Sequence, residues 1–268
     1  MRIVTLPGGL GVAFTFDEPE PTTERPRMTD RYKLGRLDAR FPVMLSALAV
    51  YGTLPTAQEV WAGPPDGGFA YGLLANDRLG DCEFAGYIHG SEAVALLDGA
   101  TMADPTDQAV AISYLAFTNG HDTGAVTADV LRLAQTEGIC GITVDAYAPG
   151  RGPLSELWQI IETFGTACLG VMLPAVAQKQ FGAGEPWDLT GTSDDNNIEG
   201  GHCVYGVAFD QGKETADVLT WGKRQTVTFR WLDRYLDEKW CLIYDLEKAK
   251  NGLDGFSFEQ LMADLRLV

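Results

Sequence analysis

The segregation of two hydrophobic patterns along the chain is the feature that most constrains its fold. Between about residues 81 and 165, apolar residues recur at helical spacing, and Gly ends several of these segments. After residue 166 the apolar segments are short, rich in β-branched and aromatic residues, and separated by turns. Because the helices come first and the strands follow, the pattern indicates an α+β fold with a helical lobe packed on an antiparallel sheet.

The individual elements can be placed from periodicity and from turn residues. Helices are predicted over residues 81–97, 105–120, 124–138 and 154–165. Strands are predicted over residues 167–174, 202–210, 216–222, 225–232 and 239–246. We also expect a hairpin around Pro7-Gly8-Gly9 and a short helix over residues 41–52.

The N-terminal part of the chain has a different composition from the rest. The stretch "DEPEPTTERPRMTDR" (17–31) is charged and rich in proline, as in a linker or an arm that wraps a surface. We therefore expect residues 1–45 to form an extended N-terminal arm and residues 46–268 to form one domain. Its helical lobe would span about residues 70–165 and its sheet lobe about residues 166–246.

The composition excludes several classes of function. A net charge of −17 argues against nucleic acid as a partner, because phosphate binding needs Lys and Arg. The sequence has no long apolar run to span a membrane, and its N-terminus is too polar for a signal peptide, so we expect a cytoplasmic protein or a component of a particle assembled there. The five Cys form no CxxC pair, and no phosphate-binding loop is present, so neither a metal nor a cofactor is expected.

Cys82 stands out in the stretch "NDRLGDCEFAGYIHG" (76–90) because it follows a Gly-Asp turn at the start of a predicted helix. A Cys is most often a small buried apolar residue. At a helix N-terminus, however, the partial positive charge and the unsatisfied N–H groups favour a thiolate and a neighbouring oxyanion. Asn76, six residues earlier, either supports the turn or offers its amide N–H to that oxyanion.

A nucleophilic Cys needs a base, and the chain has three His. His89 lies two helical turns from Cys82, about 10 Å along the axis, which is too far for a hydrogen bond. His121 falls in a predicted surface loop. His202 opens the apolar strand "HCVYGVAFD" after a polar loop, which would hold its ring rigidly, so it is the candidate base for Cys82.

The order of these landmarks resembles that of the papain-like cysteine peptidases. An amide residue precedes the Cys at the helix start by six positions, "GGHCVYGVAFD" (200–210) resembles the His strand, and "LTWGK" (219–223) stands where the family has Asn-Ser-Trp-Gly. Two further segments resemble the family, namely residues 122–139 and 176–190. The whole likeness spans roughly residues 70–245.

A narrower resemblance is to papain-like proteins of phages and bacteria with an NDxxGDC…GGH…TWG pattern. This likeness extends to "KLGRLDAR" (33–40) in the N-terminal arm. The pattern of this group does not itself specify a biological role.

The resemblance implies a role for each site residue. Cys82 would be the nucleophile, His202 the base and then the acid, Asn76 an oxyanion donor, and Trp221 the cleft aromatic that shields the His. The orienting Asn of the family falls on Leu219, which cannot form a hydrogen bond, so Thr220 or Asp217 would have to orient the ring.

The flanks of the Cys also depart from the family. Asp81 and Glu83 replace its usual neighbours, and two carboxylates beside Cys82 would raise the pKa of the thiol.

Two functions of different classes follow. The first is a thiol hydrolase that cleaves amide bonds of a peptide or protein substrate by acyl-enzyme chemistry; a Cys-His amidase or transglutaminase is a variant of it. The second is a catalytically weak or inactive module with a structural role, for example in a virion, where the arm would contact neighbouring proteins. An arm that plugs the cleft would favour a regulated enzyme, and an arm that extends away would favour assembly.

Overall fold

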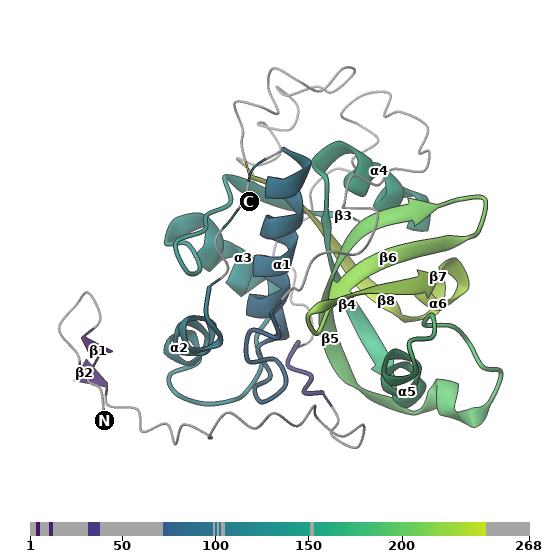
Figure 1. Ribbon diagram of the computed structural model, residues 1–268, viewed down its shortest axis with the longest axis horizontal. Coiled ribbons are helices and arrows are strands. Elements are labelled where there is room, and N and C mark those ends of the chain that lie inside the picture. Colours follow the sequence, from purple (N-terminus) through teal and green to yellow (C-terminus); the bar gives the residue numbers. More distant parts are fainter. Residues whose placement is uncertain are drawn as a thin grey trace. The chain divides into compact units, whose positions relative to one another are not determined.

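The computed structural model describes residues 4–5, 11–12, 32–37, 72–98, 100, 102, 105–150 and 153–244. The chain divides into two units, residues 1–30 and residues 31–268. In the first unit, β1 (Val4–Thr5) pairs antiparallel with β2 (Gly11–Val12), which confirms the predicted hairpin. The second unit contains the helices and the main sheet (Figure 1).

The main sheet of the second unit has six antiparallel strands in the order β3-β8-β4-β5-β6-β7 (Figure 1). The strands are β3 (Ala146–Gly150), β4 (Ala167–Pro174), β5 (Ile198–Asp210), β6 (Thr215–Thr220), β7 (Lys223–Thr228) and β8 (Leu236–Ile243). The longest strand, β5, lies between β4 and β6, so it has a hydrogen-bonded neighbour on each side.

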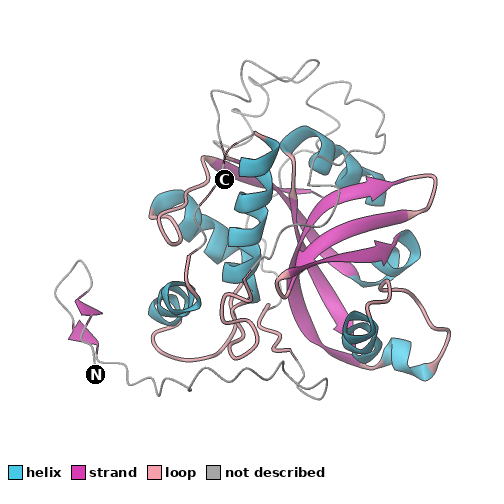
Figure 2. Ribbon diagram, viewed as in Figure 1, coloured by secondary structure: helices cyan, strands magenta, loops and turns pink. Residues whose placement is uncertain are grey.

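Helices cover both faces of this sheet (Figure 2). They are α1 (Cys82–Leu97), α2 (Asp107–Phe117), α3 (Thr127–Thr136), α4 (Leu154–Phe164), α5 (Ala175–Ala183) and α6 (Phe229–Tyr235), with a short 3₁₀ turn, η2 (Ser193–Asn196). Consecutive strand residues enter different cores, as the alternation of side chains along a strand requires. Val204 of β5 belongs to the core beneath α4–α6, whereas Cys203 and Tyr205 belong to the core shared with α1–α3.

Helix α1 is the central element of the helical side. Its residues from Cys82 to Ala93 are all buried, and it packs on β5 as well as on α2 and α3. Gly86 and Gly90 make the approach to β5 close, because a Cβ at Gly90 would lie 2.1 Å from Cδ1 of Tyr205. This packing brings the first turn of α1 next to the strand that carries His202.

The α+β class and the predicted helices and strands are confirmed, with one correction and two omissions. The strand predicted over residues 225–232 was wrong in its second half: β7 ends at Thr228, whose hydroxyl accepts a hydrogen bond from the N–H of Trp231 and begins α6. Strand β3 and helix α5 were not predicted. The short helix predicted over residues 41–52 lies outside the described residues. Among the described helices, none combines the length and the apolarity needed to span a bilayer.

Candidate functional site

Cys82 is the first residue of α1, and its side chain is buried against β5. Backbone N–H groups of Cys203 and Gly35 are directed at its sulfur and act to lower the pKa of the thiol. Burial, and then the charge of Glu83, raise the pKa of the thiol to about 12. Sulfur is therefore protonated in this state, although two donors already point at it.

His202 is held from two sides by the residues that end β6. Its Nε2 lies 2.8 Å from Oγ1 of Thr220, and its ring stacks on the indole of Trp221 at a centroid distance of 4.5 Å and an interplanar angle of 20°. Its Nδ1 is buried with no hydrogen-bond partner among the described residues. Burial, and then the charge of Arg36, lower the pKa of His202 to about 3, so the imidazole is neutral.

The two residues that contact His202, Thr220 and Trp221, lie at the tight turn between β6 and β7. Trp221 and Gly222 both have positive φ angles, 44° and 69°, and Thr220 pairs with Lys223 across the turn. Two residues with positive φ are typical of a type I′ turn, but a bulky residue rarely adopts this conformation. Trp221 adopts this unfavourable conformation, and its indole covers the ring of His202.

Of the two residues predicted to orient His202, Thr220 makes the contact. Asp217 is bonded to the neighbouring strand instead: its carboxylate accepts hydrogen bonds from Arg224 and from Oγ1 of Thr226. Leu219, where the papain-like pattern would have Asn, is buried in the core shared with α1. The alternation of side chains along β6 explains why its neighbour Thr220 reaches the imidazole.

Asn76 lies in the turn before α1, and its amide is already engaged there. Its Nδ2 donates to the carbonyl of Leu79 at 3.2 Å and to Oδ1 of Asp81 at 3.1 Å. Both N–H bonds of the amide are thus used within the turn. An oxyanion could accept from Asn76 only if one of these hydrogen bonds were broken.

Strand β5 links the two proposed reacting residues. His202 and Cys203 are consecutive on this strand, and the N–H of Cys203 is one of the two directed at Cys82 sulfur. The same backbone segment therefore fixes the imidazole and touches the thiol.

Residues 32–37 of the N-terminal region lie across this site. The N–H of Arg36 donates to the carbonyl of Gly201 at 3.2 Å, the residue before His202. On the other side, the N–H of Ala125 donates to the carbonyl of Gly35 at 2.7 Å, and that of Leu37 donates to the carbonyl of Ala125 at 2.8 Å. The segment thus forms isolated backbone bridges to Ala125 on the helical side and to Gly201 on the sheet side, and its Gly35 lies beside the Cys82 thiol.

Glycines make the close approach of this segment feasible. A Cβ at Gly35 would lie 1.6 Å from the carbonyl oxygen of Gly80, and a Cβ at Gly124 would lie 2.0 Å from that of Gly35. Tyr32 completes the cover, because its ring stacks on Trp221 at 4.6 Å and 19°, on an indole that itself stacks on His202. The sequence had not pointed to Tyr32, Gly35 or Arg36 as site residues; only the resemblance at residues 33–40 drew attention to the stretch.

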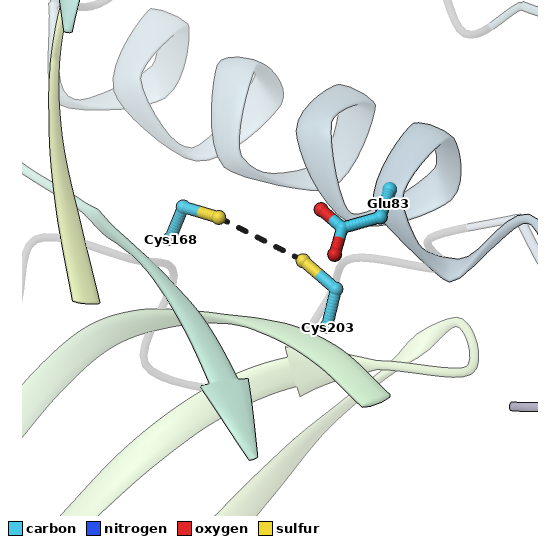
Figure 3. Close-up of side chains that lie close together, drawn as sticks. All are labelled: Glu83, Cys168 and Cys203. Atoms are coloured by element: carbon cyan, nitrogen blue, oxygen red, sulfur yellow. Dashed lines mark hydrogen bonds between the residues drawn. The ribbon is translucent and has the colours of Figure 1, made fainter. Parts of the chain in front are cut away.

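A second group of polar side chains lies beside Cys82 in the core. Figure 3 shows Glu83 of α1 directed at Cys203 and Cys168, with 3.7 Å between the two sulfurs. Thiols bind a metal as thiolates. Burial raises the pKa of both thiols and raises the pKa of Glu83 to about 8. Cys168 and Cys203 are therefore protonated thiols in hydrogen-bond contact with each other, beside a carboxyl group close enough to share a metal ion with them.

Comparisons with known proteins identify the fold. No protein-family model matches the chain, and no curated protein matches it. Among solved structures, xylellain, a cysteine protease from Xylella fastidiosa, aligns with 83% of this chain and 100% of its own, with a TM-score of 0.59 and 11% identity. The cysteine protease and lectin-like domains of Cwp84, a surface-layer-associated protein of Clostridium difficile, align over 80% of this chain and 56% of theirs, with a TM-score of 0.50 and 10% identity. The chain has the fold of the papain-like cysteine proteases, as its landmarks predicted.

Proposed function

We propose that the chain is a thiol hydrolase that cleaves peptide amide bonds with Cys82 and His202, and that residues 32–37 hold it in a blocked state. The observation that carries the proposal is the fixed imidazole of His202. Thr220 is hydrogen-bonded to its Nε2, Trp221 covers its face, and its buried Nδ1 has no partner in the part of the chain that the structure describes.

The chemistry follows from this arrangement. With the Nε2 proton directed at Thr220, Nδ1 is free to accept the proton of the Cys82 thiol. The thiolate attacks the carbonyl carbon, a C–S bond forms, and the charge moves to the oxygen. The imidazolium then protonates the leaving nitrogen as the C–N bond breaks. Water, deprotonated by the imidazole, attacks the thioester and restores the thiol.

The oxyanion would be stabilised by N–H groups at the start of α1. The backbone N–H of Cys82 is one donor that the helix N-terminus offers. Asn76 is the second proposed donor, and it would exchange its hydrogen bond to Leu79 or Asp81 for one to the oxyanion.

The shifted pKa values of Cys82 and His202 are those expected of a blocked site. Burial is the first cause of both, since it raises the pKa of Cys82 and lowers that of His202. Displacement of residues 32–37 would admit water to Cys82 and His202, which removes the first cause of both shifts. Both shifts would then shrink, which favours the thiolate–imidazolium pair.

A substitution at Gly35 tests this function in the full-length chain. Gly35→Val should expel the segment, because its Cβ would collide with Gly80, and the variant should hydrolyse a labelled casein faster than the original chain. Adding Cys82→Ala should abolish the gain, whereas adding Cys140→Ala, at a half-buried Cys outside the site, should not. Hydrolysis that survives Cys82→Ala, or no hydrolysis by any Cys82-bearing variant, would refute the proposal.

The alternative is a catalytically weak module that serves as a structural or interaction component, for example in a phage particle. The engaged amide of Asn76 and the thiol pKa of about 12 favour it. In that case Gly35→Val should leave the chain inactive, and residues 1–45 should bind neighbouring proteins of the particle.

A further inference from the structure

We infer that the site around the Arg36 side chain is a recognition site for an arginine of a bound peptide, so that the substrates are peptides with Arg at this position. The inference rests on the proposed function and deepens it, since residues 32–37 lie where a peptide must lie to reach Cys82. The site is defined by the side chains that contact or support the guanidinium: Glu83, Thr127, Met172, Asp237 and Glu238.

The guanidinium of Arg36 is enclosed and paired on two sides. Its side chain is 1% exposed; Nη1 donates to Oε1 of Glu238 at 2.7 Å, and Nη2 donates to Asp237 and contacts the sulfur of Met172 at 3.5 Å. Glu238 is buried, whereas Asp237 lies at the exposed rim. An arginine is thus held by one deep and one outer carboxylate.

Besides Arg36, two residues of the body of the protein hold the deep carboxylate. Oε2 of Glu238 accepts from Nε1 of Trp240 at 3.1 Å, and its Oε1 accepts from Oγ1 of Thr127 at 2.7 Å. Thr127 in turn lies 2.9 Å from Oε1 of Glu83. A hydroxyl has only one proton to donate. Burial keeps Glu83 protonated, with its pKa at about 8, so Glu83 can donate to Thr127 while Thr127 donates to Glu238. The site is therefore organised before any arginine enters.

Two glycines give the arginine room to enter. A Cβ at Gly170 would lie 2.9 Å from Nε of Arg36 and 2.7 Å from Oε1 of Glu238. A Cβ at Gly201 would lie 2.6 Å from the carbonyl oxygen of Arg36. These positions on β4 and β5 leave space for the side chain and for its backbone.

Arg36 is the buried charged side chain of the segment, whereas Lys33 pairs with Asp122 at the surface, where an ion pair contributes little. The backbone bonds to Ala125 and Gly201 do not depend on which side chain stands at position 36, as in other cases where a peptide pairs with a sheet edge through its main chain. Tyr32 and Leu34 add apolar contacts to Trp221 and Gly200, while Lys33 and Leu37 are exposed. A buried Glu238 without a cation would also be left with an uncompensated charge, which penalises a neutral side chain.

A binding measurement tests the inference without requiring turnover. The protein is the full chain with Gly35→Val, Arg36→Ala and Cys82→Ser, so that the site is vacated and cleavage cannot occur. The probe is the labelled hexapeptide Tyr-Lys-Leu-Gly-Arg-Leu, compared with the same peptide carrying citrulline, a neutral analogue of nearly the same shape, in place of Arg. Affinities are read by fluorescence polarisation.

We expect the Arg peptide to bind about ten- to a hundredfold more tightly than the citrulline peptide, the range for hydrogen bonds to charged groups. Adding Glu238→Gln should bring this ratio close to one, and Asp233→Asn, at an exposed acid on α6, should leave it unchanged. Should the triple variant fail to fold by circular dichroism, Gly35→Ala with Arg36→Ala and Cys82→Ser serves in its place, because even an alanine Cβ at position 35 would lie 1.6 Å from the carbonyl oxygen of Gly80.

Equal affinities for the two peptides would overturn the inference. Binding of neither peptide at millimolar concentration would also overturn it, because the site would then hold only the chain's own Arg36. Failure of the proposed function has a different signature: the Arg preference would persist in the Cys82→Ser background, while no Cys82-bearing variant would hydrolyse any peptide.

Discussion

At the scale of single residues, the site differs from its expected pattern mainly at the position that orients His202. A threonine hydroxyl takes the place of an amide, and the contact of 2.8 Å is short enough to fix the ring. A hydroxyl can both donate and accept, so Thr220 can support the neutral imidazole and the imidazolium.

Replacement of Thr220 tests this role. Thr220→Val keeps the shape of the side chain but removes the hydroxyl, and we expect kcat of the unblocked Gly35→Val chain to fall about 10- to 100-fold. Thr220→Ser should restore most of the activity, since it returns the hydroxyl. The control is Thr226→Val, which removes a hydroxyl bonded to Asp217. Equal losses in Thr220→Ser and Thr220→Val would show that packing matters here and that the hydrogen bond does not.

Asp81 predicts a pH dependence of stability. Burial raises its pKa from 3.8 to about 8, despite the hydrogen bond from Asn76, so the native state keeps a proton that the unfolded state loses near pH 4. Because the unfolded state binds fewer protons between about pH 4 and pH 8, the free energy of unfolding should fall as pH rises through this window, by up to about 1.4 kcal/mol per pH unit for one group. Glu83, whose pKa burial also raises to about 8, should add to the slope.

Urea titrations at several pH values measure this slope. Asp81→Asn resembles the protonated carboxyl and should flatten the slope, whereas Asp233→Asn at an exposed position should not alter it. An unchanged slope in Asp81→Asn would mean that Asp81 is ionised in the native state.

At the scale of elements, the approach of α1 to β5 decides where Cys82 lies. Gly90 contacts the ring of Tyr205 so closely that any side chain must displace it. Alanine is the better helix former by about 1 kcal/mol, so propensity alone predicts stabilisation by Gly90→Ala. The collision dominates, and we expect a net loss of about 1–3 kcal/mol in the free energy of unfolding.

The matched control for this prediction is Gly212→Ala, in a turn where the nearest atom would be 3.4 Å from the new Cβ. A smaller ring partner, Tyr205→Leu, should rescue part of the loss in Gly90→Ala. Denaturant unfolding of Gly90→Ala, Gly212→Ala, Tyr205→Leu and the Gly90→Ala/Tyr205→Leu double variant measures the loss of stability and its rescue. Stability gained by Gly90→Ala would contradict the close packing of α1 on β5.

The elements that could be predicted from sequence are those whose cause is local. The helical spacing of α3 and the short apolar runs of β4 and β5 can be recognised within a few residues. Helix α6 was missed because its start depends on the Thr228 cap, inside a segment that otherwise has the composition of a strand. The sequence also leaves open whether Thr220 or Asp217 orients the ring, because the answer depends on which face of β6 meets His202.

At the scale of the whole molecule, the position of residues 32–37 was beyond sequence reasoning. Nothing local in "YKLGRL" indicates that Gly35 will contact Gly80 and Gly124, or that Arg36 will meet Glu238 some two hundred residues later. The sequence predicts an N-terminal arm that either plugs the cleft or extends away from the body. Residues 32–37 bridge Ala125 and Gly201 beside the site, and this contact is what our proposal of a blocked enzyme rests on. The role of the arm in assembly stays a prediction.

The reactivity of Cys82 towards iodoacetamide as a function of pH, with mass-spectrometric readout of the modified residue, tests the blocked Cys-His pair most directly. In the original chain we expect slow alkylation that rises only in alkaline solution, since burial raises the thiol pKa to about 12. In Gly35→Val we expect fast alkylation that stays nearly constant down to about pH 5, as for a thiolate paired with an imidazolium. The same slow, alkaline profile in both proteins would contradict a reactive pair at Cys82 and His202.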